Sequence, residues 1–173
     1  RIHFHDGCSI DLTSDLIRMR DQIEAMEPGA FARFLSFMEE GYRHYTLSLR
    51  AFVGRNFRSY AEYFSPANLP LLFKLKALQK HAPNVARYFR DRRLLAAFSF
   101  QNMYLGLSPY DAPATYSLLQ YIELCEGVWY PRGGMYRVIK SLESIGDGLG
   151  VRYRYGAPVA AITGTNGKGT TTR

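Results

Sequence analysis

Two glycines directly before an amphipathic stretch are the first feature of this sequence that could do chemistry. Pro131-Arg132-Gly133-Gly134 precedes a segment with apolar residues at helical spacing. Glycine lets the backbone come close to a ligand, and the free amide groups in the first turn of a helix attract negative charge. The motif therefore predicts a close-approach ligand site, although an ordinary tight turn fits the same residues.

A second candidate is the glycine-rich tail, which reads Ile162-Thr-Gly-Thr-Asn-Gly-Lys-Gly-Thr-Thr-Thr172. It resembles the phosphate loop of the Mur ligase and folylpolyglutamate synthetase families, in which Lys168 would bind phosphate and Thr170 or Thr171 would lie near magnesium. The spacing departs from the standard Gly-x-x-x-x-Gly-Lys-Ser/Thr loop, and no helix can follow within this sequence. Asn166-Gly167 is also a favourable hairpin turn. An ATP-binding ligase fragment resting on Gly164 to Thr172 stays open as an alternative.

Other reactive side chains form no recognisable site. His3 and His5 share one face of a strand, but no third metal ligand lies near them in the sequence, so we predict no metal site. Cys8 and Cys125 are far apart and lack metal-type spacing, which favours a reduced intracellular setting. No Ser/His/Asp or Cys/His set can be assembled, and the catalytic residues stay unassigned.

The chain is basic, with 22 Lys and Arg against 15 Asp and Glu and a formal net charge of +7. Such a charge suits nucleic acid, an anionic membrane surface or a phosphorylated ligand. No nucleic-acid-binding motif accompanies the charge, so we expect no nucleic-acid partner. No apolar run is long enough to span a bilayer as a helix. A non-catalytic, basic, membrane-associated domain is a further alternative.

The elements that must position these residues are mostly helices. Alternation around Asp6-Gly7 predicts a hairpin. Thr13 or Ser14 is the expected cap of a helix that begins near Asp15, and a longer helix is expected from Ala30 towards Leu49. On the longer helix, the expected apolar face is Phe31, Phe34, Leu35, Met38 and Tyr42, opposite Arg33, Glu40 and Arg43.

Further along, a leucine-rich helix is expected over 71–80 and is ended by Pro83, and another begins at Ala114 or Thr115. The pattern then predicts a strand at 127–130, a helix over 135–149, and strands at 151–155 and 159–163. The fold class is therefore α+β, mainly helical with a small mixed or antiparallel sheet. The predicted regions are a hairpin (1–12), a helical region for substrate and membrane (13–126), a strand-helix-strand segment (127–163) and a turn or tail (164–173).

Several ordered segments resemble one known family, the phytoene desaturases, nearest their fungal members. These segments are Phe98-Ser-Phe-Gln101, Met103-Tyr-Leu-Gly-Leu-Ser-Pro-Tyr-Asp-Ala-Pro113, Tyr116-Ser-Leu-Leu-Gln-Tyr121, Gly127-Val-Trp-Tyr-Pro-Arg-Gly-Gly134 and Gly150-Val-Arg-Tyr-Arg-Tyr-Gly-Ala-Pro-Val159. Each segment alone is weak, but their order and spacing are specific. The resemblance covers almost the whole chain and ends near Ile162.

That resemblance implies a flavoprotein of the amine oxidase superfamily, which passes hydride from the long polyene precursor phytoene to FAD in carotenoid biosynthesis. The dinucleotide fingerprint Gly-x-Gly-x-x-Gly of this family is absent, and the sequence begins at Arg1 rather than Met. We therefore expect an internal fragment that is inactive alone, with FAD bound mostly by regions outside it.

The resemblance also assigns roles to positions. Gly133, Gly134 and Val159 would contact the cofactor, with Val159 approaching the adenosine part of FAD through its backbone. The expected wall of the substrate tunnel comprises Phe100, Tyr104, Tyr116, Tyr121, Trp129, Tyr130 and Arg132. An apolar substrate implies an intracellular protein attached peripherally to a membrane, and Lys74, Lys76 and Lys80 are the candidates for that surface.

Overall fold

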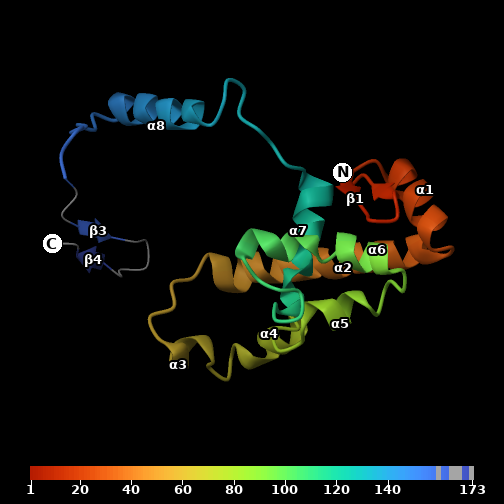
Figure 1. Ribbon diagram of the computed structural model, residues 1–173. Coiled ribbons are helices and arrows are strands. Elements are labelled where there is room, and N and C mark those ends of the chain that lie inside the picture. The colour runs from red at the N-terminus through yellow and green to blue at the C-terminus, as the bar shows by residue number, and fades with distance from the viewer. Residues whose placement is uncertain (159–160, 164–168, 172–173) are drawn as a thin grey trace. The chain divides into compact units, whose positions relative to one another are not determined.

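The computed structural model describes residues 1–158, 161–163 and 169–171 (Figure 1). The chain divides into two compact units, Arg1–Gly127 and Val128–Arg173. The described residues are mostly helical and include two small antiparallel sheets of two strands each. The helical character agrees with the predicted fold class, whereas no mixed sheet occurs among the described residues.

The first unit begins with the expected hairpin. Strands β1 (Ile2–His3) and β2 (Ser9–Ile10) pair antiparallel, with Ile2 opposite Ile10. Gly7 has a left-handed φ of +82°, which glycine adopts without steric cost, and the Phe4 amide donates to the Cys8 carbonyl at 2.8 Å. This hairpin places Ile10 in the core, where it is fully buried.

Helix α1 (Leu16–Met26) begins one residue later than the predicted start near Asp15. The carboxylate of Asp15 accepts hydrogen bonds from the amides of Ile17 and Arg18, so Asp15 is the cap and the prediction of Thr13 or Ser14 was wrong. Asp15 accepts bonds from two of the otherwise unpaired amides of the first turn. Met19 and Ile23 are buried, whereas Leu16, which has the same helical spacing, is 55% exposed.

Helix α2 (Ala30–Ser48) runs through the first unit and continues as a π-helical turn, η1 (Leu49–Val53) (Figure 1). Its buried face differs from the predicted one. Leu35 and Tyr42 are 44% and 50% exposed, whereas Glu40 is only 2% exposed. The face is rotated because a buried polar network and the close packing of α7 lie where the sequence pattern placed solvent. The core cluster comprises Ile10, Met19, Ile23, Ala30, Phe34, Phe37, Met38, Val85, Phe89, Leu94, Ala97, Phe98 and Leu124.

The expected single helix over 71–80 is also wrong. The segment contains α4 (Leu69–Lys74), which ends where Lys76 adopts a left-handed φ of +52°. The Ala77 amide donates to the Leu72 carbonyl and the Lys76 amide to the Phe73 carbonyl, each at 3.0 Å, which is the pattern of a Schellman ending. Pro83 does not end a helix, because it lies in the first turn of α5 (His81–Val85), where a missing amide costs no hydrogen bond.

The remaining helices of the first unit are short. They are α3 (Tyr60–Tyr63), α6 (Arg92–Ala97), the 3₁₀ turns η2 (Phe100–Leu105) and η3 (Ala114–Tyr116), α7 (Ser117–Tyr121) and the π-helical turn η4 (Ile122–Glu126). The three consecutive elements from η3 to η4 correspond to the helix expected from Ala114 or Thr115. Helix α7 packs extensively against α2 (Figure 1).

The second unit contains α8 (Tyr136–Gly148) and a hairpin of β3 (Ala161–Thr163) and β4 (Gly169–Thr171), with Ile162 opposite Thr170. Strands were expected at 127–130 and 151–155, but these residues are not strands. A strand needs a neighbour for its backbone donors and acceptors, and none of the described strands pairs with either segment.

Candidate functional site

The turn before α8 has the backbone expected of a close-approach site. Gly133 and Gly134 have φ values of +87° and +93°, and the Gly134 amide donates to the Pro131 carbonyl at 3.0 Å. A side chain at Gly133 would lie 3.2 Å from Cγ of Arg137. Both positions therefore favour glycine, Gly133 on steric as well as conformational grounds.

Basic side chains surround this turn. A cavity of about 550 Å³ is lined by Pro131, Arg132, Arg137, Val138, Lys140, Ser141, Ser144 and Ile145. Lys140 lies 2.8 Å from the Glu143 carboxylate, whose hydrogen bond and charge raise the pKa of Lys140. No side chain caps the start of α8, so this helix end, with Arg132 and Arg137, carries positive charge.

The predicted tunnel residues of the second unit are strongly exposed. Trp129 and Tyr130 are 86% and 74% exposed, and Arg132 is also exposed. They immediately precede or belong to the glycine turn. Within this unit the structure thus brings together Tyr130, Arg132 and the two predicted cofactor glycines, with the Tyr130 hydroxyl 3.8 Å from the position of a Cβ at Gly134.

In the first unit, Tyr121 belongs to an aromatic group formed by α2 and α7. Its ring centroid lies 5.5 Å from that of Tyr42 and 5.7 Å from that of Tyr45. The close approach depends on Gly41, because a Cβ there would lie 2.7 Å from the Ser117 carbonyl oxygen and 2.8 Å from Tyr121 Cβ. Sequence reasoning assigned Tyr42 to the core and did not single out Tyr45. Their three-residue spacing on one helix was the available signal.

The other predicted tunnel residues of this unit lie on η2 and η3. Phe100 and Tyr104 are 41% and 63% exposed, and Tyr116 is partly buried. The Tyr104 hydroxyl lies 3.5 Å from the Glu123 carboxylate, and burial together with this carboxylate raises the pKa of Tyr104. That all seven tunnel residues line one cavity remains a prediction, because three of them belong to the second unit.

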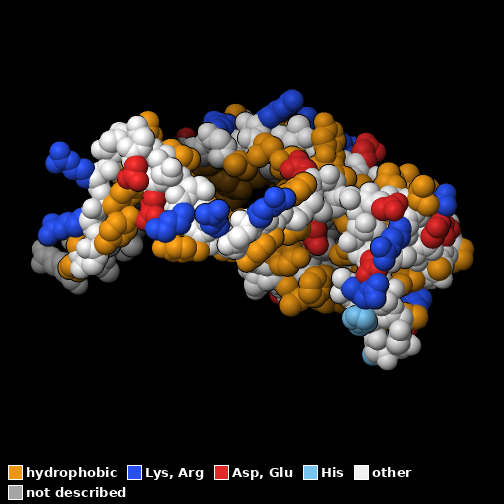
Figure 2. Space-filling view, turned by 90° about the horizontal axis from the view of Figure 1, so that it is seen from above, with side chains coloured by type: hydrophobic (Ala, Val, Ile, Leu, Met, Phe, Trp, Pro, Cys, Tyr) orange, Lys and Arg blue, Asp and Glu red, His pale blue; other side chains and the backbone are white. Residues whose placement is uncertain are grey.

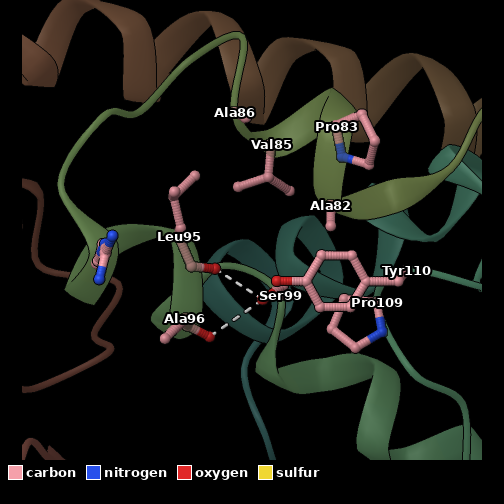
Figure 3. A pocket seen from close by; sticks show the side chains of 10 residues that line it. Ala82, Pro83, Val85, Ala86, Leu95, Ala96, Ser99, Pro109 and Tyr110 are labelled. Atoms are coloured by element: carbon pink, nitrogen blue, oxygen red, sulfur yellow. Dashed lines mark hydrogen bonds between the residues drawn. The ribbon is translucent and has the colours of Figure 1, made fainter.

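A groove of about 730 Å³ lies elsewhere on the first unit (Figure 3). Figure 3 shows Val85 and Leu95 on its sides, with the hydroxyl of Ser99 donating to the Leu95 carbonyl at 2.7 Å. Its walls are mainly apolar and could contact an apolar ligand. None of the predicted tunnel residues lines it, and its full set is Ala82, Pro83, Val85, Ala86, Arg92, Leu95, Ala96, Ser99, Pro109 and Tyr110.

A buried ionic network joins α2 to the segment after α4, and sequence reasoning missed it. The Glu40 carboxylate accepts hydrogen bonds from Lys76 Nζ, from Asn84 Nδ2 and, at 2.9 Å, from the Tyr88 hydroxyl. Lys76 also donates to Asn84 Oδ1 at 2.8 Å. Burial raises the pKa of Glu40, but these hydrogen bonds and the charge of Lys76 outweigh it and lower the pKa overall. Burial and the bond to Glu40 raise the pKa of Tyr88 to about 12.

This network corrects one membrane prediction. Lys76 was expected at a membrane surface, yet its side chain is only 18% exposed and pairs with Glu40. A lysine committed to a buried carboxylate does not offer its charge to lipid. The sequence shows that Phe37, Glu40, Gly41 and His44 share one helix face, but the partners that bury Glu40 come from distant residues.

Two predictions concern residues that the structure does not describe. Val159 lies outside the described residues, and so do Asn166, Gly167 and Lys168 of the glycine-rich tail. A phosphate loop must lead into a helix, whereas Gly169–Thr171 form strand β4. The hairpin of β3 and β4 therefore disfavours the ATP-binding alternative. Among the described residues, no group of three His, Cys, Asp or Glu side chains could hold a metal ion.

Comparison with known proteins found one family match and several similar sequences. Residues 5–173 match the family model described as flavin containing amine oxidoreductase. The chain is 43% identical over 168 residues to a zeta-carotene-forming phytoene desaturase from Myxococcus xanthus, covering 97% of this chain and 32% of that protein. It is 44% identical over 169 residues to a phytoene desaturase from Neurospora crassa, covering 96% of this chain and 28% of that protein.

A relative of lower identity is named a 4,4'-diapophytoene desaturase. The 4,4'-diapophytoene desaturase of Staphylococcus haemolyticus is 30% identical over 161 residues, which is 93% of this chain and 32% of that protein. The chain thus spans about a third of the length of the curated relatives that it matches.

Proposed function

Because the chain belongs to the family of flavin-containing amine oxidoreductases, we propose that it is part of an FAD-dependent phytoene desaturase of carotenoid biosynthesis. The observation that carries the proposal is the identity of 43% and 44%, over nearly the whole chain, to relatives named phytoene desaturases. This piece would supply part of the substrate wall and a flavin contact. The rest of the flavin site would come from other parts of the protein.

The described residues fit part of a dinucleotide site. The left-handed Gly133 and Gly134 let the backbone approach a ligand, and Arg132, Arg137 and the start of α8 provide positive charge for phosphate groups. Val159 is proposed as a further backbone contact to the adenosine part. Bound FAD would supply the hydride-accepting chemistry, while the protein orients the substrate and excludes water.

For the substrate, we propose that the aromatic residues hold the polyene by apolar burial, which contributes about 25 cal/mol per Å² of covered apolar surface. Phe100, Tyr104, Tyr116 and Tyr121 would provide this surface from the first unit, together with Tyr42 and Tyr45 beside Tyr121. Trp129 and Tyr130 would lie near the reacting region. Phytoene carries no charge, which suits such a wall.

Replacing Gly134 with leucine tests the flavin contact. In the complete protein, Gly134→Leu should weaken FAD binding at least about tenfold, because leucine disfavours a φ of +93° and fills the space next to the Tyr130 hydroxyl. Flavin fluorescence titration of the apoprotein measures the change.

Gly150→Leu is the matched control, since Gly150 has a φ of +74° with nothing within 4 Å of an added Cβ, beyond the far end of α8. It imposes similar backbone strain without approaching the turn. Equal FAD affinity in Gly134→Leu and the unmodified protein would show that Gly133-Gly134 is an ordinary turn that does not contact the flavin.

We further propose that the protein is intracellular and attaches peripherally to a membrane, because its proposed substrate is apolar. Lys74 is exposed, and so are two apolar residues near it in the sequence, Phe73 and Leu78, at 67% and 73%. Lys80 Nζ donates to the Asp111 carbonyl at 3.1 Å. Figure 2 shows basic side chains among apolar ones on the visible surface. Among the described residues, no helix combines the length and apolarity needed to cross a bilayer.

Vesicle sedimentation tests this attachment. Lys74→Gln and Lys80→Gln should each weaken binding to anionic vesicles about fivefold, because a lysine near such a surface contributes about 1 kcal/mol. Lys140→Gln is the control, since Lys140 already pairs with Glu143. Equal binding to neutral and anionic vesicles, unchanged in both variants, would contradict a role for these lysines.

A further inference from the structure

A cluster of four uncharged polar side chains is completely buried in the first unit. His81 of α5, Gln101 and Asn102 of η2, and Gln120 of α7 are each 0% exposed. Buried amides and imidazoles normally satisfy nearly all of their hydrogen-bonding groups. None of these four side chains has a role in the proposed function.

Part of the cluster is held together by direct hydrogen bonds. Nε2 of Gln120 donates to the Phe98 carbonyl at 2.7 Å and to Oε1 of Gln101 at 3.1 Å. Nε2 of His81 lies 3.3 Å from the same Phe98 carbonyl. These contacts fix the orientation of both glutamine amides and place the imidazole beside them.

Five polar atoms of the cluster nevertheless have no partner among the described residues. They are Nδ1 of His81, Nε2 of Gln101, Oε1 of Gln120, and both Nδ2 and Oδ1 of Asn102. Turning the amides over does not help. A reversed Gln120 would lose its bond to the Phe98 carbonyl, and Asn102 lacks partners in either orientation.

The unpaired atoms are a mixture of donors and acceptors. The amide nitrogens of Gln101 and Asn102 can only donate, whereas the amide oxygens of Gln120 and Asn102 can only accept. A cation would be repelled by the donors, and an anion by the acceptors. Water both donates and accepts, and a buried water typically makes about three hydrogen bonds.

We propose that this cluster is an internal hydration site. One ordered water bonds to Nε2 of Gln101 and Oε1 of Gln120, whose side chains are already joined by a hydrogen bond, and a second bonds to the side chain of Asn102. Burial lowers the pKa of His81, in keeping with a neutral imidazole. The site joins η2 to α7, which carry Phe100, Tyr104 and Tyr121, and it requires neither flavin nor substrate.

Oxygen-17 magnetic relaxation dispersion of the complete protein tests the site, because it counts waters that stay inside a protein. Gln101→Met keeps the length of the side chain but removes its donor, and should lower the count by about one water. Asn102→Leu should remove the second water. Gln79→Met, at an exposed glutamine of the same unit, should leave the count unchanged.

An unchanged count in a folded Gln101→Met or Asn102→Leu variant would overturn the proposal. If neither variant folds, a high-resolution crystal structure of the unmodified protein decides. Water density within hydrogen-bonding distance of Gln101 and Gln120 supports the site, and protein groups bonded to these atoms, or an empty cluster, refute it. These outcomes do not depend on whether the protein desaturates phytoene.

Discussion

Replacing Glu40 with alanine should destabilise the protein by about 3–5 kcal/mol, the typical cost of removing one partner from a buried ion pair. Glu40 is 2% exposed and accepts hydrogen bonds from Lys76, Asn84 and Tyr88. Without it, the Lys76 charge and two polar side chains lose their shared acceptor. Lys76 also loses the ion pair that accompanies its left-handed backbone. Urea denaturation, monitored by circular dichroism, measures the change in the free energy of unfolding.

The neighbouring Glu39→Ala is the control, because Glu39 is exposed and forms only a weak pair, 3.9 Å from Arg43. It should change stability by less than about 0.5 kcal/mol. The double variant Glu40→Met with Lys76→Met should lose less stability than the two single variants lose together, since it leaves no buried charge unpaired. Similar costs for Glu39→Ala and Glu40→Ala would contradict the network.

The same carboxylate gives a defined pH dependence. Its pKa in the folded protein is lowered from the ordinary value of 4.5, so its contribution to stability is present above pH 4.5 and disappears as the pH falls through the lowered pKa. Below pH 4.5 the unmodified protein should therefore lose stability faster than Glu40→Gln.

Replacing Gly41 with alanine should lower the free energy of unfolding by about 3 kcal/mol, which is the upper end of the range for overpacking a tight core. The added Cβ would lie 2.7 Å from the Ser117 carbonyl oxygen, which is backbone and cannot rotate away. Helices α2 and α7 must then separate, and Tyr121 must shift from Tyr42 and Tyr45. The change is measured as a lower midpoint of urea unfolding and as an altered tyrosine near-ultraviolet circular dichroism signal.

Gly54→Ala is the matched control, because the nearest atom to its added Cβ is the Leu49 carbonyl oxygen at 3.9 Å. It should leave stability nearly unchanged. A Gly41→Ala protein as stable as the Gly54→Ala protein would show that α2 and α7 do not pack at the distance described.

Local patterns predicted much of the fold. Asp6-Gly7 indicated the hairpin of β1 and β2, and apolar spacing indicated α1, α2 and α8. These features depend on residues near one another in sequence. The failed predictions depended on distant partners: Glu40 is buried because Lys76, Asn84 and Tyr88 meet it, and a helical wheel of α2 alone cannot show that.

For the candidate site, the sequence predicted the family and the glycine pair, but not the backbone before that pair or the neighbours of Tyr121. Motif order and spacing indicated the family, which the match over residues 5–173 bears out, and the glycine pair proved to have the left-handed backbone that such a site needs. The strand expected before it did not form, because extended residues become a strand only with a partner. Tyr42 and Tyr45 were missed as neighbours of Tyr121, because their contact requires the close approach at Gly41.

The most direct test of the proposed function is an assay of the complete protein, loaded with FAD and supplied with phytoene in vesicles and with an electron acceptor. We predict that absorption bands of longer conjugated polyenes grow with time and that no product forms when FAD is omitted. The decisive contradiction would be a folded, FAD-loaded protein that leaves phytoene unchanged in the presence of an electron acceptor.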